Sequence, residues 1–391
     1  MQPLDTTSMV YGNLNILIYR NYSMYLDVNN EGRKMELELP ATEKELSLFE
    51  KYLPIWIAIC MVGGIVMSQA LPGISAVIDS WQVGGVSIPI GICLFLMMYP
   101  AMLNFQVSEL KKLGRNPQPI LLTLISNWIV APLVGYGLAT LLLPGQEQLI
   151  VAVILLTSSP CTAMVLVWGY LANGNQEQNV ITTSINTFTL ILLYAPLVAI
   201  FTGLSNIPID RWLLLVSAFV FIGLPLLLGV VSRRVLVDWK GKEWFESTYR
   251  PAVGNLALVA LLTTLIVLFS LNGSIMLDRP DLLVLVSVPL IAGFAIVVGY
   301  NLLVTRIVGL AYQEGVISVI IGSSSHFEIA IATAVSIYGV GSIAALGTTM
   351  GLFWEVPIML GLVYLAKHLK SKDYWKQPSE TTKREAVQYT E

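Results

Sequence analysis

The sequence predicts an all-α, polytopic membrane protein with ten transmembrane helices, arranged as two inverted five-helix repeats with broken fourth and ninth helices. Three observations lead to this fold class: an apolar composition, long apolar stretches, and an uneven placement of Lys and Arg. Of the 391 residues, 55% are hydrophobic and 12% are charged, whereas a soluble domain carries about 25% charged residues. This composition excludes a soluble enzyme, a disordered protein and a nucleic-acid-binding protein, and a net charge of −3 leaves no basic surface for phosphates.

The apolar stretches fix the predicted spans. A helix needs about 20 apolar residues to cross the hydrocarbon layer of a membrane. By this criterion we expect ten spans, at residues 53–71, 84–103, 119–143, 149–171, 180–203, 212–231, 252–271, 282–304, 316–338 and 343–366. Pro and Gly inside several spans are tolerated in membrane helices. The three Cys residues are too few for a disulfide framework, and none belongs to a CxxC pair.

The placement of Lys and Arg predicts the orientation of these spans. Positively charged residues are enriched in cytoplasmic loops. With both termini in the cytoplasm, 20 of the 22 Lys and Arg residues fall on the cytoplasmic side, and only Arg211 and Arg279 fall outside. This split supports the span count, because one missed helix would invert every loop that follows it. We therefore expect a multi-pass protein of the plasma (inner) membrane.

The same spans define the predicted domain organisation. Residues 1–45 are polar, lack the apolar region of a signal peptide, and are expected to form a flexible cytoplasmic segment. Residues 46–208 form the first repeat, residues 209–370 the second, inverted repeat, and residues 371–391 a cytoplasmic tail. Because the tail is charged beyond about Ser371, we expect it to be disordered.

Two matching interruptions indicate where a ligand would bind. Secondary transporters built from inverted repeats bind their substrate near the midplane, where a corresponding helix in each half is broken. The fourth span is interrupted by residues 157–162 (TSSPCT), and the ninth by residues 322–328 (GSSSHFE). Pro160 frees backbone polar groups of its helix, and such groups are tolerated at mid-membrane depth where they line an enclosed or watery cavity. The alternative is a pair of kinked helices that pack through small residues.

Titratable side chains near these interruptions suggest a coupling ion. An ionised Asp, Lys or Arg at mid-membrane costs roughly 2.5–3.5 kcal/mol, and Glu should be comparable. Because of this cost, a Glu at the depth of Glu328 indicates a specific role for its carboxyl group. A carboxyl group that binds a proton in one state and releases it in another is what proton coupling requires. Glu355 is the other acid placed inside a span, and it could instead pair with backbone donors freed near Pro357. For His326 we expect a structural or tuning role, because helical neighbours point about 100° apart.

The cysteine of the fourth span suggests a soft substrate. Cys60 and Cys93 are best interpreted as small apolar fillers, whereas Cys161 lies in the interruption, directly after Pro160. A thiol is a soft ligand that suits a soft element and not sodium. A single thiol permits reversible exchange with trivalent arsenic, whereas three converging thiols would hinder its release. Four Asn residues near span centres or ends serve either helix packing or recognition of hydroxyl groups: Asn127, Asn186, Asn255 and Asn301.

Several segments resemble the arsenite efflux permeases of the bile-acid/arsenite/riboflavin transporter superfamily. They are residues 81–84 (WQVG) leading into the second span, 88–91 (IPIG) and 96–100 (LMMYP) within it, 159–165 (SPCTAMV) in the fourth, 327–332 (FEIAIA) in the ninth, and 355–357 (EVP) in the tenth. The likeness covers roughly residues 45–370. It implies export of As(III) by proton antiport, with Cys161 and Glu328 essential. The family commonly has Asn directly before the Phe-Glu pair, where this chain has His326.

These expectations combine into one hypothesis of transport. Arsenous acid reaches the midplane from the cytoplasm, and Cys161 exchanges with one As–OH group. The hydroxyl groups of Ser158, Ser159, Thr162, Ser324 and Ser325 bind the remaining oxygens, with Pro160 and Asn127 in structural or tuning roles. Protonation of Glu328 from the outer side then competes with bound substrate, while one bundle rocks against the other. The expected partners are arsenite, by the same chemistry antimonite, protons and the lipid bilayer.

The alternatives belong to other functional classes. A sodium-coupled transporter of an organic anion would not need Cys161. A membrane-embedded protease needs paired mid-span Asp, a Ser–His dyad or HExxH, and the sequence contains none of these, so we expect no enzyme. A passive channel would also use broken helices. Because GxxxxGK[ST] is absent, we expect no ATPase subunit, and we expect no cofactor and no nucleic-acid partner.

Overall fold

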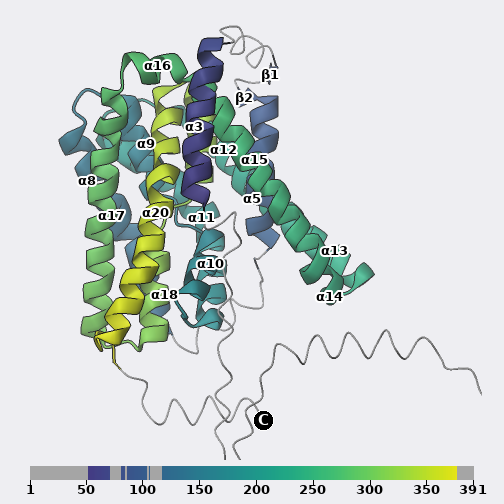
Figure 1. Ribbon diagram of the computed structural model, residues 1–391, viewed down its shortest axis with the longest axis vertical. Coiled ribbons are helices and arrows are strands. Elements are labelled where there is room, and N and C mark those ends of the chain that lie inside the picture. Colours follow the sequence, from purple (N-terminus) through teal and green to yellow (C-terminus); the bar gives the residue numbers. More distant parts are fainter. Residues whose placement is uncertain (1–51, 71–80, 84–85, 104, 106–116, 377–391) are drawn as a thin grey trace, which may run out of the picture. The chain divides into compact units, whose positions relative to one another are not determined.

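The computed structural model describes residues 52–70, 81–83, 86–103, 105 and 117–376, which are almost entirely helical (Figure 1). The helices are α3 (Leu53–Ala70), α5 (Ile88–Leu103), α7 (Pro117–Ile125), α8 (Ala131–Leu142), α9 (Glu147–Thr157), α10 (Met164–Leu171), α11 (Gln176–Leu204), α12 (Arg211–Ala218), α13 (Leu224–Lys240), α14 (Lys242–Trp244), α15 (Arg250–Leu271), α16 (Gly273–Asp278), α17 (Asp281–Val308), α18 (Tyr312–Gly322), α19 (Phe327–Tyr338) and α20 (Ile343–Ser371). A two-residue antiparallel hairpin, β1 (Gln82–Val83) and β2 (Val86–Ser87), precedes α5.

The helical class and the membrane character of the chain are confirmed. Six described helical runs are long and apolar enough to cross a membrane: Pro117–Leu142, Gln176–Leu204, Arg211–Lys240, Lys242–Leu271, Asp281–Val308 and Ile343–Ser371. The first two predicted spans correspond to shorter apolar helices, and the fourth and ninth are each split in two, so no half has full length. The predicted start of the second span at residue 84 was too early, because strand β2 comes first and α5 begins at Ile88. The arrangement of ten spans in inverted repeats stays a prediction.

Three of the long runs contain a short π-helical segment just before a proline. These segments are Ser126–Val130, Phe219–Gly223 and Phe245–Tyr249, and each is followed within two residues by Pro132, Pro225 or Pro251. Proline has no backbone N–H, so the regular ladder of i to i−4 hydrogen bonds cannot continue through it. A π-turn shifts the hydrogen bonds by one residue and lets the helix continue.

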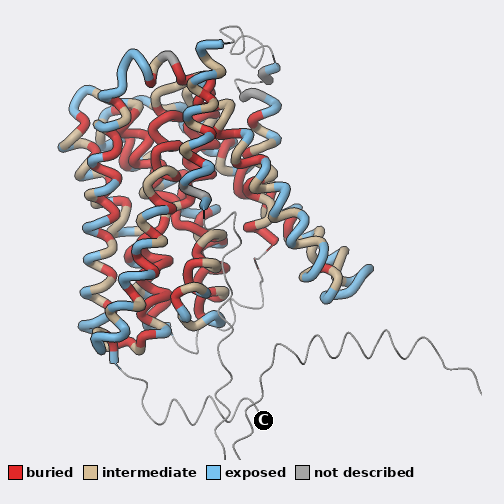
Figure 2. Tube along the Cα trace, in the orientation of Figure 1, coloured by how far each residue is buried: buried red, intermediate tan, exposed pale blue. Residues whose placement is uncertain are grey.

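The helices pack in two groups. Helix α15 packs along α3 and α5, and α13 packs on α5. In the other group α9 packs against α8, α19 and α20, while α17 packs against α8, α18 and α20. The two groups contact each other directly, because α5 packs against α19 and α3 against α20, and α12 also contacts α19. Figure 2 shows that buried residues gather in the middle of the described helices, and that outward faces and the tip formed by α13 and α14 are exposed.

The start of the predicted cytoplasmic tail is not disordered, which corrects our expectation. Helix α20 ends at Ser371, but Trp375 is only 4% exposed. Its ring packs edge-on against Tyr312 with centroids 5.4 Å apart, and its Nε1–H donates a hydrogen bond to Thr305 Oγ1 at 3.2 Å. The apolar ring therefore outweighs the charged residues around it and holds the chain against α17 and α18.

This contact generates a stability prediction. We expect Trp375→Ala to lower the free energy of unfolding by about 3–5 kcal/mol, because it removes a buried aromatic ring and leaves a cavity. Thermal unfolding of the purified protein in detergent measures the effect. The matched control is Trp212→Ala, since Trp212 is 74% exposed and its loss creates no cavity. Equal melting temperatures for the two variants would contradict the docking of Trp375.

Candidate functional site

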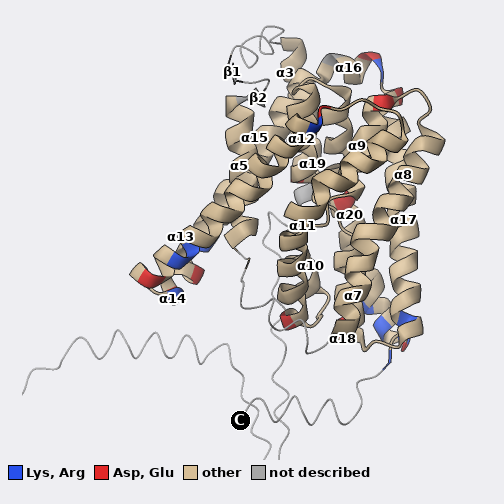
Figure 3. Cartoon of the chain, turned by 180° about the vertical axis from the view of Figure 1, so that it is seen from behind, with Lys and Arg blue, Asp and Glu red and all other residues tan. Residues whose placement is uncertain are grey.

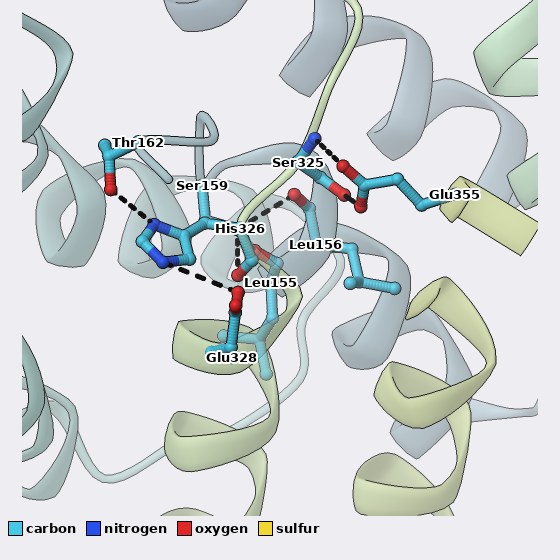
Figure 4. A network of polar contacts seen from close by, with 8 residues as sticks. All are labelled: Leu155, Leu156, Ser159, Thr162, Ser325, His326, Glu328 and Glu355. Atoms are coloured by element: carbon cyan, nitrogen blue, oxygen red, sulfur yellow. Dashed lines mark hydrogen bonds and ion pairs between the residues drawn. The ribbon is translucent and has the colours of Figure 1, made fainter. Parts of the chain in front are cut away.

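The two interrupted helices meet at their interruptions. Helix α9 ends at Thr157 and α10 begins at Met164, while α18 ends at Gly322 and α19 begins at Phe327. The irregular segments between them, residues 158–163 and 323–326, pair through an antiparallel bridge between Pro160 and Ser325. The N–H of His326 donates to the carbonyl of Ser159 at 2.6 Å, and Ser159 Oγ donates back to the carbonyl of His326 at 3.2 Å (Figure 4). The breaks predicted from the sequence thus lie together inside the protein.

His326 has one ring nitrogen next to Thr162 and the other next to Glu328, two side chains that the sequence predicts to be functional. Its Nδ1 lies 3.2 Å from Thr162 Oγ1, and its Nε2 lies 3.4 Å from Glu328 Oε2 (Figure 4). The ring is fully buried, and neither Nε2 nor Oε2 has a hydrogen-bond partner among the described residues. Our expectation from helical spacing does not apply here, because His326 precedes the first turn of α19.

Glu328 lies in the first turn of α19 and is 8% exposed. The free backbone N–H groups at a helix N-terminus favour a negative charge. The helix N-terminus therefore favours the ionised form of this carboxyl group, whereas its burial favours the neutral form. This is a suitable location for a group that changes protonation during a transport cycle.

Glu355 binds the second interruption from a neighbouring helix. Its Oε1 accepts a hydrogen bond from the N–H of Ser325 at 3.0 Å, and its Oε2 accepts one from the hydroxyl group of Ser325 at 2.6 Å. The sequence left open whether this side chain pairs with donors near Pro357 on its own helix, and in the structure it pairs with donors of the break. Glu355, which is 4% exposed, therefore holds the irregular segment in position.

Cys161 is a free thiol that is 2% exposed. Among the hydroxyl groups that we expected to bind substrate, most are engaged within the protein. Ser159 donates to carbonyls, Thr162 contacts His326, Ser324 lies 3.4 Å from the carbonyl of Ile321, and Ser325 is held by Glu355. The hydroxyl group of Ser158 is buried without a partner among the described residues, so it is available to a ligand.

A cavity of about 40 Å³ lies on one side of the crossing. It is lined by Ala131, Val134, Leu156, Thr157, Pro289, Leu290, Gly293, Phe294, Val297, Ser323, Ser324, Ser325 and Gly351. Ser324 and Ser325 therefore line this cavity, whereas Cys161 and Glu328 do not. A second, apolar cavity of about 490 Å³ lies between α5, α12 and α19 and reaches Ser336.

The structure shows different surroundings for the four Asn residues whose roles the sequence left undecided. Asn301 Nδ2 lies 2.8 Å from Ser126 Oγ and 3.0 Å from Ser323 Oγ, so it packs the end of α18. Asn255 is exposed. Asn127 and Asn186 are buried, and amide atoms of both have no partner among the described residues.

Sequence reasoning missed several buried hydroxyl groups near these Asn residues. Ser126 Oγ donates to the carbonyl of Gly322 at 2.8 Å. Thr182 and Thr183 of α11 are buried without hydroxyl partners within the described part of the chain. Ser and Thr are common in membrane helices, so no local signal marked these three. The structure contains no group of three His, Cys, Asp or Glu that could hold a metal ion among its described residues.

The bonds made by Glu355 generate a stability prediction. We expect Glu355→Ala to lower the free energy of unfolding by about 1–3 kcal/mol, because it leaves the partly buried N–H and hydroxyl group of Ser325 without their acceptor. Glu355→Gln keeps one acceptor oxygen and should lose less. The measurement is thermal unfolding, with Glu243→Ala as control because Glu243 is exposed at the tip of α14. If Glu355→Ala melted like its control, Glu355 would not support the break.

The chain is similar to known transporters over most of its length. A family model described as the Sodium Bile acid symporter family matches residues 91–279. An uncharacterized transporter, slr0944 of Synechocystis sp., is 40% identical over 345 residues, which cover 82% of this chain and 89% of the relative. The arsenical-resistance protein Acr3 of Alkaliphilus metalliredigens is 31% identical over 84% of this chain and 94% of its own length.

A second relative named for arsenical resistance comes from another organism. The arsenical-resistance protein Acr3 of Corynebacterium glutamicum is 30% identical over 87% of this chain and 94% of its own length. Both proteins are matched almost from end to end, so the similarity includes the two interrupted helices and is not confined to one segment. The chain therefore belongs to the arsenical-resistance (arsenite efflux permease) family of the bile-acid/arsenite/riboflavin transporter superfamily.

Proposed function

We propose that this protein is a secondary transporter that exports arsenite, As(III), from the cytoplasm in exchange for protons. The observation that carries the proposal is the crossing of the two broken helices, where the segment bearing Cys161 is bonded to the segment that leads into Glu328. A soft ligand and a titratable acid thus share one buried crossing. The relatives named for arsenical resistance support arsenic as the element carried.

The proposed architecture is ten spans in two inverted repeats, residues 46–208 and 209–370, in the plasma membrane with both termini cytoplasmic. The breaks support it, because they occur in the fourth and ninth helical spans and meet in antiparallel fashion. Helices α11 and α20, the last of each repeat, both have 29 residues and contain an internal proline. The grouping of helices also supports it, because α3, α5, α13 and α15 belong to the first two spans of each repeat.

The proposed substrate chemistry is a reversible exchange at one sulfur atom. The Cys161 thiol and one As–OH group of arsenous acid form an S–As bond and release one water molecule, so no oxidant or reductant is needed. Thiols suit soft elements, and a single S–As bond can be reversed by water. The unpartnered hydroxyl group of Ser158 is the first candidate to bind a remaining As–OH group, with Ser324 and Ser325 facing the nearby cavity. Antimonite has the same chemistry.

The proposed coupling group is Glu328. Because the carboxyl group is buried in the first turn of α19, its charge affects the stability of the crossing. Proton binding to Glu328 from the outer side competes with bound substrate, and the two groups of helices rock against each other to alternate access. The passive-channel alternative would need no such titratable group.

A sodium-coupled transporter of an organic anion is the second candidate. Its support is the description of the matching family model, which names sodium and bile acid. This function would use oxygen ligands for sodium and would not require Cys161. The two candidates therefore differ in their need for one sulfur atom and in the driving ion.

The proposal predicts transport that depends on both groups. In everted membrane vesicles with an acidic interior, the wild-type protein should accumulate arsenite, because protons leaving the vesicle drive arsenite in. We expect Cys161→Ser and Glu328→Gln each to reduce accumulation about tenfold or more, which corresponds to a loss of about 1.4 kcal/mol. Cys60→Ser is the matched control, since Cys60 is also buried but lies in α3, outside both breaks.

Two results would contradict the proposal. Full arsenite transport by both Cys161→Ser and Glu328→Gln would end the proposed mechanism. Uptake of an organic anion that depends on a sodium gradient and persists in Cys161→Ser would favour the second candidate.

A further inference from the structure

The proposed function leaves His326 without a role, although the residue lies between both functional segments. Its ring is fully buried and carries two nitrogens that can each donate or accept a hydrogen bond. Nδ1 faces Thr162, the residue after Cys161, at 3.2 Å, and Nε2 faces Glu328 at 3.4 Å. In Figure 4 the ring lies directly between these two side chains. No other described side chain touches both breaks in this way through one rigid group.

We propose that His326 is a positioning residue that connects Glu328 to Thr162, so that a proton on Glu328 sets the direction of the hydrogen bond made to the segment bearing Cys161. The inference rests on the proposed function and deepens its coupling step. It assigns the link between the proton-binding side chain and the substrate-binding segment to one side chain.

The two arrangements follow from the chemistry of a neutral imidazole, in which one nitrogen donates and the other accepts. With Glu328 ionised, Nε2–H donates to Oε2, and Nδ1 accepts the hydroxyl proton of Thr162. With Glu328 protonated, its carboxyl group donates to Nε2, and Nδ1–H donates to Thr162 Oγ1.

The change between these arrangements balances. Glu328 takes up one proton from the outer side, Nε2 releases its proton to water, and Nδ1 takes one proton from water, while the hydroxyl group of Thr162 keeps its own proton and rotates. One proton is consumed, and the ring remains neutral with one N–H throughout. The 3.4 Å separation of Nε2 and Oε2 is long for a hydrogen bond, but such contacts commonly shorten when a site becomes occupied.

Few other titratable groups surround the ring in the described part of the chain. The charged residues lie mostly at the ends of the helices (Figure 3). Tyr194 of α11 donates a hydrogen bond to Thr333 of α19 at 3.0 Å, and Glu355 of α20 is held by Ser325. The other groups on the packed elements are Tyr338 of α19, Tyr364, Lys367, His368 and Lys370 of α20, Cys93 and Tyr99 of α5, Glu147 of α9, Tyr170 of α10, Arg211 of α12, and Cys161 in the first break. Among these, Tyr99 is bonded to Ser232 and Tyr249. Glu328 is the one carboxyl group that the structure records against the ring.

Two amide substitutions separate the two contacts of the ring. The side-chain nitrogen of Gln in His326→Gln takes the approximate place of Nε2, so this variant keeps a donor for Glu328 but loses Thr162. The shorter Asn in His326→Asn takes the approximate place of Nδ1, so it keeps Thr162 but loses Glu328. Thr162→Val removes the link from the opposite side. The matched control is Thr202→Val, because the hydroxyl group of Thr202 is buried and bonds within its own helix α11.

The experiment compares arsenite uptake into everted vesicles between pH 5.5 and 8.5 for these variants. We expect His326→Gln, His326→Asn and Thr162→Val to flatten the pH profile alike, and the double variant His326→Gln/Thr162→Val to add nothing further. Thr202→Val should keep the wild-type profile. A profile of unchanged shape, lowered equally at every pH in the first three variants, would indicate a structural role for His326 and overturn the inference.

A second measurement does not depend on the substrate. A hydrophobic carbodiimide labels protonated carboxyl groups in membranes, and mass spectrometry of the full-length protein identifies the labelled peptide of Glu328. At pH 7 we expect severalfold more labelling of Glu328 in His326→Asn than in His326→Gln, because only the latter keeps a donor to the carboxylate. Equal labelling of the two variants would overturn the inference. Absence of arsenite transport by the wild-type protein would instead overturn the proposed function, and the labelling would still decide the role of His326.

Discussion

The structure of the site depends on one constraint: irregular backbone inside a hydrocarbon layer must find its hydrogen bonds within the protein. Two interrupted helices create free N–H and C=O groups at the same place, and each supplies partners for the other. The carbonyl of Ser159 accepts from the N–H of His326, and the carbonyl of His326 accepts from Ser159 Oγ. The N–H of Ser325 turns to Glu355. These bonds join the two interrupted helices at the place where the substrate is proposed to bind.

This constraint also limits which side chains are free for a ligand. Ser159, Ser325 and Thr162 were expected to bind substrate oxygens, but in the structure they hold the crossing together. A ligand that used them would have to replace bonds between the two breaks. Binding and release at these three residues would therefore require rearrangement of the crossing itself, and such a rearrangement would link occupancy of the site to the movement of one group of helices against the other. Ser158 can receive a ligand without breaking such a bond.

Much of this arrangement could be predicted from the sequence, because its signals are local. Apolar length located the helices, and Pro160 with its neighbouring Ser and Thr residues located the first break. The partners across the fold could not be predicted in the same way. Glu355 lies 30 positions from Ser325, and the short distance between His326 and Glu328 does not follow from helical spacing, because His326 precedes the first turn of α19. Charge content misled us about Trp375, since one large ring outweighs the charged residues that surround it.

The position of Glu355 follows from small residues earlier in its helix. A Cβ atom on Gly351 would lie 2.5 Å from Leu156 of α9, and one on Gly347 would lie 2.8 Å from Ala152. These glycines therefore let α20 approach α9 closely, as small residues four positions apart do in membrane helices. Residues 347, 351 and 355 share one face of α20, since four positions make about one turn. The close approach thus continues along the helix, and the next residue on that face is Glu355. Its carboxylate reaches Ser325, which follows α18 and pairs with Pro160 just beyond the end of α9. The spacing of two glycines and one acid sets the contact that holds the second break.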